Sequence, residues 1–217
     1  ESVMPCCSND TCSSSVAATE RYRLVLWIVL AINGVMFLAE IVAGLAAGSA
    51  ALQADALDFF ADAANYGISL FVLGLGIRWR ARAALMKGLS MGLFGLWVIG
   101  SVMWHALHGT VPGWETMGVV GMLALAANVA CLALLYAWRQ GDANMRSVWI
   151  CSRNDVIANL AVLAAAFGVF GTGTGWPDII VAAVMAALAL QGSATVVRQA
   201  LAELRDEADA DSIPMLR

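Results

Sequence analysis

Residues 52–65, LQADALDFFADAAN, carry the pattern that decides how the rest of the chain is interpreted. Three carboxylates, Asp55, Asp58 and Asp62, lie here in an otherwise apolar segment. On a helix of 3.6 residues per turn, spacings of three and four residues place all three on one stripe. An ionisable side chain at bilayer depth is costly, so such residues are candidates for a functional site by default.

The composition of the chain places this segment in a membrane. Apolar residues make up 61% of the 217 residues and charged residues 13%, against roughly 45–50% and about 25% in a soluble domain. Six apolar stretches are long enough to cross a hydrocarbon core, which takes about 20 helical residues. They are residues 24–46, 50–77, 87–108, 116–137, 147–170 and 177–198. The sequence therefore predicts an all-α integral membrane protein, a bundle of six transmembrane helices.

Basic residues indicate how this bundle is oriented. The connections GLAAGS, HGTVPGWET and GTGTGWPD contain no Lys or Arg, whereas the other connections and both ends do. By the positive-inside rule, the N- and C-termini are both cytoplasmic. The basic residues on the predicted cytoplasmic side are Arg21, Arg23, Arg78, Arg80, Arg82, Lys87, Arg139, Arg146, Arg153, Arg198, Arg205 and Arg217. The segment RWRARAALMK is expected to be a short cytoplasmic loop.

Two polar segments flank the predicted transmembrane domain of residues 21–200. Residues 1–20 are rich in Ser and Thr and are expected to be flexible; residues 201–217 form a short cytoplasmic tail, too small to fold alone. Thiolates at Cys6, Cys7 and Cys12 could capture a soft metal ion. The alternative is that a reducing cytosol keeps these cysteines unliganded. Nothing in either segment indicates a nucleic-acid partner.

Polar residues in the first and third predicted helices have simpler interpretations. Asn33 and Glu40 are seven residues apart and therefore share a face, which we expect to point into the bundle because lipid does not tolerate a glutamate. His105 and His108 lie one turn apart at the outer end of the third stretch. They could bind a metal ion that leaves the protein, or they could simply be solvated at the interface.

The fifth stretch supplies a second polar cluster. Cys151, Asp155 and Asn159 recur at steps of four and thus lie on one helix face. Asp142 is a suitable helix cap, so this helix is expected to begin before the membrane and to bring Cys151 to the depth of Asp58.

Two ligand pairs follow from these spacings. Asp58 with Asp62, and Cys151 with Asp155, each allow one ion to touch both members of a pair. Four such ligands from two packed helices suit the tetrahedral coordination of Zn²⁺ or Cd²⁺. Asp55 on the same side is predicted to support the site or line an exit path. Asn154 and Asn159 are candidates to orient the ligands.

These residues resemble a known family, the cation diffusion facilitators. The resemblance covers NGVMFLAEIVAGLAAGSAALQADALDFFADAAN and NMRSVWICSRNDVIANLAVL, within six spans and with both ends inside. It implies export of divalent metal from the cytoplasm in exchange for protons. Family members carry His or Asp and then Asp in the second helix, and His then Asp in the fifth. Here Asp58, Asp62, Cys151 and Asp155 occupy those positions.

Two departures from the family pattern affect the expected function. Cys151 stands where a histidine is usual, as a natural or engineered feature, and its softer sulfur favours Zn or Cd over Mn, Fe or Co. The usual C-terminal cytoplasmic domain is expected to be absent, so a homodimer would form through the transmembrane helices. Metal and protons compete for the same ligands, which is sufficient to couple their movements.

The sequence therefore predicts a metal/proton antiporter working by alternating access, not an enzyme, in a bacterial inner membrane. No prosthetic group is expected; the metal ion is the cargo. One alternative is an uncoupled metal channel, and another is a purely structural role for the polar residues. A third is a membrane-embedded, metal-dependent enzyme of lipid-headgroup transfer, whose acids are similarly spaced. The longer DG…AR pattern of those enzymes does not occur here.

Overall fold

A computed structural model describes residues 9–71, 77–138 and 143–212 as helices and short connections. Within this part of the chain, the side chains at positions 9–19, 69, 71, 77, 80, 138, 143–152 and 207–212 are not described. The helices are α1 (Asn9–Ala47), α2 (Ala50–Phe71), α3 (Ile77–His108), α4 (Trp114–Leu135), α5 (Ala143–Thr172) and α6 (Trp176–Ser212), with one 3₁₀ turn, η1 (Tyr136–Trp138). The predicted all-α, six-helix bundle is confirmed.

Five of the six helices are long and apolar enough to cross a membrane by length and composition: α1, α3, α4, α5 and α6. The sixth, α2, has 22 residues like α4 but carries the three acids. Its residues Ala50 to Leu57 are all buried by the other helices. Asp55 and Asp62 are buried as well and Asp58 is half-buried, so the acids are largely covered by protein, which is the arrangement that membranes tolerate.

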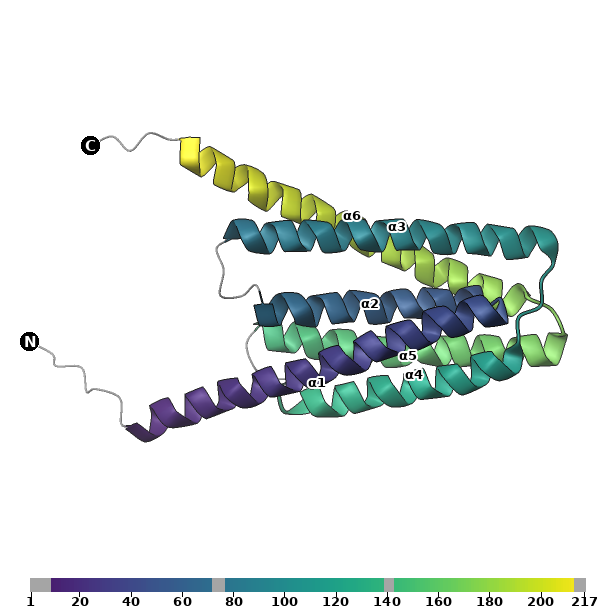
Figure 1. The fold of residues 1–217 in the computed structure, drawn as a ribbon, viewed down its shortest axis with the longest axis horizontal. Coiled ribbons are helices and arrows are strands. Elements are labelled where there is room, and N and C mark those ends of the chain that lie inside the picture. Colours follow the sequence, from purple (N-terminus) through teal and green to yellow (C-terminus); the bar gives the residue numbers. More distant parts are fainter. Residues whose placement is uncertain (1–8, 72–76, 139–142, 213–217) are drawn as a thin grey trace, which may run out of the picture.

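The six helices pack unevenly. α3 packs chiefly against α6, α1 against α2, and α4 against α5. Figure 1 shows the α3–α6 pair on one side of α2, with α1, α4 and α5 on the other. Both termini leave from the same end of the bundle, which we call the terminal end.

Glycines allow α3 and α6 to approach closely. A Cβ atom added to Gly88 would lie 2.8 Å from the Val197 side chain, and one added to Gly92 would lie 2.8 Å from Ser193 Oγ. The Ser193 hydroxyl donates a 2.7 Å hydrogen bond to the Gly88 carbonyl. Small residues at helix contacts permit such close packing in membranes.

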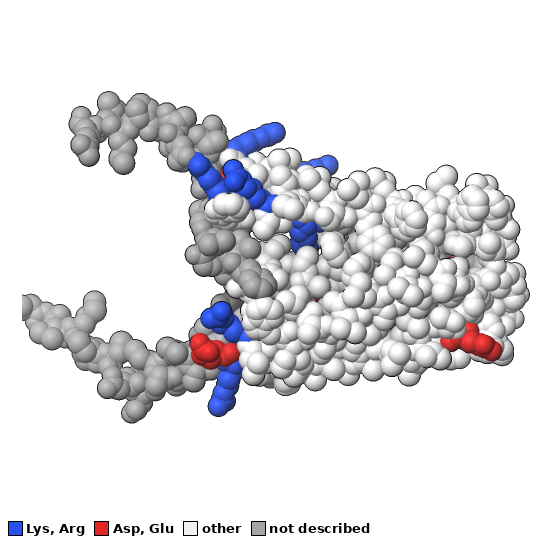
Figure 2. All heavy atoms as spheres, viewed as in Figure 1, with Lys and Arg blue, Asp and Glu red and all other residues white. Residues whose placement is uncertain are grey.

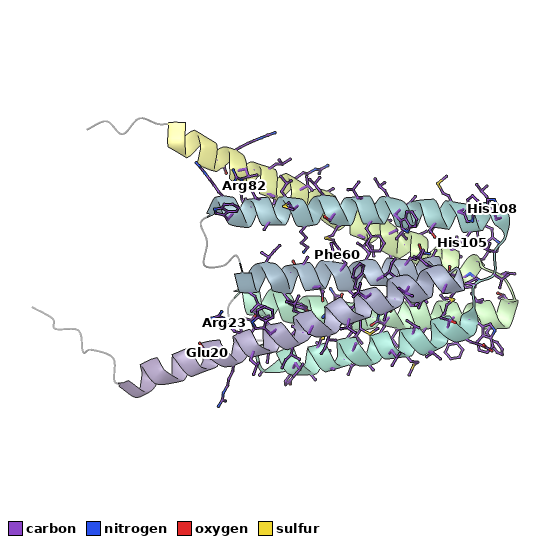
Figure 3. All side chains as sticks on the ribbon, in the orientation of Figure 1. Glu20, Arg23, Phe60, Arg82, His105 and His108 are labelled. Atoms are coloured by element: carbon purple, nitrogen blue, oxygen red, sulfur yellow. The ribbon has the colours of Figure 1, made fainter. Side chains whose placement is uncertain are left out.

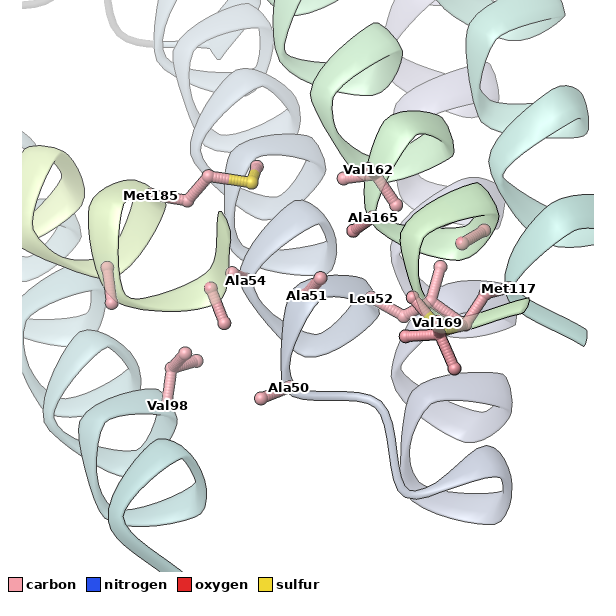
Figure 4. Close-up of a cluster of buried hydrophobic side chains, with 13 residues drawn as sticks. Ala50, Ala51, Leu52, Ala54, Val98, Met117, Val162, Ala165, Val169 and Met185 are labelled. Carbon is pink, nitrogen blue, oxygen red and sulfur yellow. The ribbon is translucent and has the colours of Figure 1, made fainter. Parts of the chain in front are cut away.

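The largest hydrophobic cluster lies around the first turns of α2 (Figure 4). Alanines of α2, including Ala50, Ala51 and Ala54, meet side chains from α3, α4, α5 and α6. Alanine has little bulk, so four helices can close around this end of α2. The cluster therefore fixes α2 at the centre of the bundle. Its members from the other helices include Val98, Met117, Val162, Val169 and Met185.

The helices extend further than the predicted spans. α1 begins at Asn9, inside the segment expected to be flexible, and α6 continues to Ser212, through most of the expected tail. The prediction of a loop over RWRARAALMK was wrong, because Ile77 already begins α3 rather than ending the second span. This segment contains no glycine or proline, and Arg, Ala, Leu, Met and Lys are good helix formers. The helix therefore continues beyond its apolar part.

Positive charge gathers at the terminal end. On the face shown in Figure 2, Lys and Arg lie toward the end from which the termini leave, and the opposite end shows none. Arg23 and Arg82 are labelled at the terminal end in Figure 3, and His105 and His108 at the opposite end. The assignment of the terminal end to the cytoplasm stays a prediction from the positive-inside rule.

Candidate metal site

The position of α2 is fixed at its first turn by an acid from another helix. Asp178 of α6 accepts hydrogen bonds from the backbone N–H groups of Ala50 at 2.8 Å and Ala51 at 3.1 Å. It also accepts the Ser49 hydroxyl at 2.6 Å. These N–H groups have no partner within their own helix, so Asp178 satisfies them and its charge opposes the positive helix end. Asp178 lies in the first turn of its own helix, α6, and also caps α2.

The acidic stripe of α2 meets α5 deep in the bundle. The Asp62 and Asp155 side chains lie within hydrogen-bonding distance of each other. Asp58 is near enough to interact with both of them through charge. Tyr66 donates a 3.0 Å hydrogen bond to Asp62 Oδ2, while Asp155 Oδ2 is buried and accepts no hydrogen bond among the described residues. Three of the four predicted ligands are therefore neighbours.

A polar network continues from this stripe toward the opposite end of the bundle. Asn159 Nδ2 donates to both Asp55 carboxylate oxygens, at 2.9 and 2.8 Å. Asn128 Nδ2 of α4 donates to Asn159 Oδ1 at 2.8 Å, which fixes the orientation of the Asn159 amide. All three side chains are at most 3% exposed. Asp55 is thus held by α5 and indirectly by α4, which suits the supporting role expected for it.

The two polar residues of α1 point inward, as expected. Glu40 is fully buried and Asn33 is 1% exposed. The Glu40 carboxyl lies within hydrogen-bonding distance of the Asp55 carboxyl, and neither Glu40 oxygen accepts a hydrogen bond from a donor among the described residues. Asn33 Nδ2 bonds the Val29 carbonyl at 2.7 Å and lies 3.6 Å from Cys131 Sγ. α1 therefore contributes one further acid beside the stripe.

Other predicted site residues are not brought into this cluster or lie outside the description. Asn154 is exposed on α5, in contrast to the buried Asn159. Cys151 belongs to α5, but its side chain is not described, and the same holds for Cys12 in α1. Cys6 and Cys7 lie outside the described residues, as does the expected cap Asp142. Among the described side chains, no three His, Cys, Asp or Glu residues converge tightly enough to hold a metal ion.

The histidine pair at the opposite end is engaged by separate partners. His105 Nδ1 contacts the Thr110 hydroxyl. His108 Nδ1 lies 2.9 Å from the Trp104 carbonyl, and its ring stacks on the Trp104 ring at 3.8 Å between centroids. The Nδ1 atom of each imidazole is therefore directed at a partner of its own, and the role of the pair in metal release stays a prediction.

Sequence reasoning missed two residues near the acids. Asn128 is a single amide in an apolar stretch, a signal that could have identified it as a bundle-facing residue. Lys87 was counted only among the basic residues of the expected loop, yet its ammonium group bonds Asn65 Oδ1 and acts through charge on Asp62. The sequence pattern did not show that α3 begins at Ile77, ten residues before the apolar stretch that starts at residue 87.

Comparisons with known proteins identify the family of the chain. Residues 26–205 match the cation efflux transmembrane domain. The chain therefore belongs to the cation efflux family, whose members are transporters and not enzymes. The lipid-headgroup enzyme considered as an alternative is thereby set aside.

Relatives in this family are similar over most of the chain. Zinc transporter ZitB of Yersinia pestis is 23% identical over 90% of the chain, and metal cation efflux system protein CzcD of Cupriavidus metallidurans is 25% identical over 72%. The human proton-coupled zinc antiporter SLC30A8 is 24% identical over 73%. The chain spans 67%, 54% and 51% of these relatives' own lengths.

Proposed function

We propose that this protein exports divalent transition metal ions across a membrane in exchange for protons, with Zn²⁺ or Cd²⁺ as the favoured cargo. The observation that carries the proposal is the contact between Asp62 of α2 and Asp155 of α5, with Asp58 beside them, inside the bundle. Buried carboxylates of like charge repel unless a cation or a proton lies between them. A divalent ion bound between the carboxylates removes this repulsion, and its binding is a function for the three acids.

The ligand set explains the proposed choice of metal. Asp58, Asp62 and Asp155 offer oxygen, and Cys151, one turn before Asp155 on α5, offers sulfur. Thiolate and carboxylate together in a four-ligand set suit Zn²⁺ and Cd²⁺. The names of the relatives, which include a zinc transporter and a proton-coupled zinc antiporter, support the same cargo.

Proton exchange follows from the chemistry of the same groups. Two carboxyl groups can hydrogen bond to each other only when one carries a proton, because an ionised carboxylate only accepts. We propose that the neighbouring Asp62 and Asp155 share a proton in this way while no metal is bound, and that the neighbouring Glu40 and Asp55 do the same. Metal binding requires deprotonated ligands, so arrival of a metal ion expels a proton.

The bundle offers a mechanical division for alternating access. The α3–α6 pair packs closely on itself, and α2, with the site residues, lies between this pair and the other helices. We propose that the pair rocks against the remaining helices and exposes the site first to the cytoplasmic terminal end and then to the opposite end. The expected homodimer and the bacterial inner membrane belong to the same proposal.

Metal uptake by proteoliposomes tests the proposal. With an imposed pH gradient, we expect Zn²⁺ or Cd²⁺ flux from the parent protein, and a loss of at least about tenfold for Asp58→Ala and Asp155→Ala. Glu115→Gln removes an exposed acid on α4 and should transport normally. Normal transport by the two site variants would overturn the site assignment. Flux that continues after the gradient is collapsed would favour the uncoupled channel.

The role of the sulfur ligand is tested in the same vesicles. Cys151→His should lower the preference for Cd²⁺ over Mn²⁺ or Co²⁺, because imidazole is a harder ligand than thiolate. An unchanged preference would argue against Cys151 as a ligand.

A further inference from the structure

One basic residue reaches into the bundle instead of lying at its rim. Lys87 is in the apolar span of α3, Ala81–His108, and is partly buried. Its ammonium group donates a hydrogen bond to Asn65 Oδ1 on α2. Asn65 lies three residues after Asp62 and thus about one turn nearer the terminal end. A lysine at this depth is as costly as an acid and is likewise a candidate for function.

The packing of α3 fixes the direction of Lys87. Its neighbour Gly88 is pressed against α6, where an added Cβ atom would meet Val197 at 2.8 Å. Met91, one turn beyond Lys87, is buried in a cluster with Leu57 of α2 and Ala189 of α6. Residues four apart share a helix face, so Lys87 and Met91 both point toward α2. The lysine is therefore directed at the acidic helix by the same contacts that join α3 to α6.

Lys87 lies beside the acids of the candidate metal site. The hydrogen bond to Asn65 holds the Lys87 ammonium about one turn from Asp62 on α2, and the Asp155 and Asp58 carboxyl groups are neighbours of Asp62. The other described cations of α3 with placed side chains, Arg78 and Arg82, lie in its first two turns, nearer the terminal end. Figure 3 shows Arg82 there.

We propose that Lys87 is a built-in cation of the transport site: its ammonium, anchored by Asn65, neutralises Asp62 while no metal is bound, and must withdraw when a metal ion enters. A lysine suits this role because its charge sits on a flexible four-carbon stem. Lys87 and the metal ion then compete for the same carboxylate. The competition with a metal ion rests on the proposed function. The interaction between Lys87 and Asp62 does not depend on that function.

A double-mutant cycle in metal-free protein tests the interaction without any transport. Thermal midpoints of the full chain in detergent with chelator are measured for Lys87→Met, Asp62→Asn and the double variant. We expect the effect of Lys87→Met to differ by about 2–4 °C between the parent and the Asp62→Asn variant, the shift that a coupling of tenfold or less produces in a chain of this size. Additive shifts would overturn the proposal. Lys87→Gln serves in the same cycle if Lys87→Met does not fold.

Affinity for Zn²⁺ alone tests the competition. Lys87→Met should bind Zn²⁺ about five- to tenfold more tightly than the parent, because a nearby positive charge has been removed. Lys87→Arg, which keeps the charge, should stay near the parent value. Arg82→Met is the matched control: it removes one positive charge from the same helix at an exposed position over the Trp79 ring and should leave the affinity unchanged.

The two experiments separate this proposal from the function it builds on. Unchanged Zn²⁺ affinity in Lys87→Met, with binding lost in Asp62→Ala, would overturn the role of Lys87 and leave the metal site intact. Coupling in the metal-free cycle with no Zn²⁺ binding by the parent would support the charge pair and overturn metal transport. If Arg82→Met changed the Zn²⁺ affinity as much as Lys87→Met does, the effect would come from the overall positive charge of the protein. That result would overturn the proposal.

Discussion

At the scale of single residues, two asparagines of α5 differ in role although they are five positions apart. Asn159 is fully buried and donates to both Asp55 oxygens, whereas Asn154 is exposed. The sequence placed both among the supporting residues, because composition and spacing alone do not show which side of the helix meets α2. The structure makes only Asn159 a neighbour of the acidic stripe.

We expect Asn159→Leu to reduce metal affinity about tenfold, the lower end of what loss of a supporting residue outside the ligand set costs. The change removes the amide that holds Asp55 and leaves Asn128 without its acceptor. Zn²⁺ titration of the purified protein measures the effect. Asn154→Leu is the control on the same helix and should bind Zn²⁺ like the parent. Equal losses in the two variants would show that Asn159 has no special part in the site.

At the scale of helices, the contact between α3 and α6 depends on glycines of α3, because the absence of a Cβ atom lets α6 approach closely. An added Cβ at Gly88 would lie 2.8 Å from Val197 Cγ2 and 3.3 Å from the Val197 backbone nitrogen. Valine is stiff at χ1, so it cannot readily turn away. Gly100, on the same helix, has open space in the corresponding direction.

These two glycines give a matched pair of substitutions. Gly88→Ala should lower the free energy of unfolding by about 1–3 kcal/mol, the usual cost of overpacking. Gly100→Ala should be neutral or slightly stabilising, because alanine favours a helix by about 1 kcal/mol over glycine. Thermal unfolding in detergent compares the variants with the parent. A Gly88→Ala protein as stable as Gly100→Ala would contradict the close packing of α3 on α6.

At the scale of the whole molecule, charge and topology agree. The described basic residues gather toward the end from which both termini leave, and the connections at the opposite end have none. An even number of crossings requires both ends of the chain to lie on one side. The positive-inside rule then predicts that this side is the cytoplasm.

Labelling of introduced cysteines tests this orientation in intact cells. Val111→Cys, in the connection before α4, should react with a membrane-impermeant thiol reagent above the parent level. Arg205→Cys, in the extension of α6, should react only after permeabilisation. The reverse pattern would invert the orientation, and labelling of both from outside would contradict an even number of crossings.

The six apolar stretches, the stripe of Asp55, Asp58 and Asp62, and the partner pair on the fifth helix are all local patterns, so the sequence by itself determined the bundle and its candidate ligands. Helix period and hydropathy depend only on residues near one another in the chain, so they can be read from the sequence without the tertiary structure. The tertiary structure alone decided which polar residues meet. It brought Asn159 and Glu40 to Asp55, placed Asp178 at the start of α2, and directed Lys87 toward Asp62. Such contacts join residues far apart in sequence, and they follow from how each helix is rotated and where it begins. The glycines of α3 and the buried alanines of α2 set those rotations through packing, which no local pattern records.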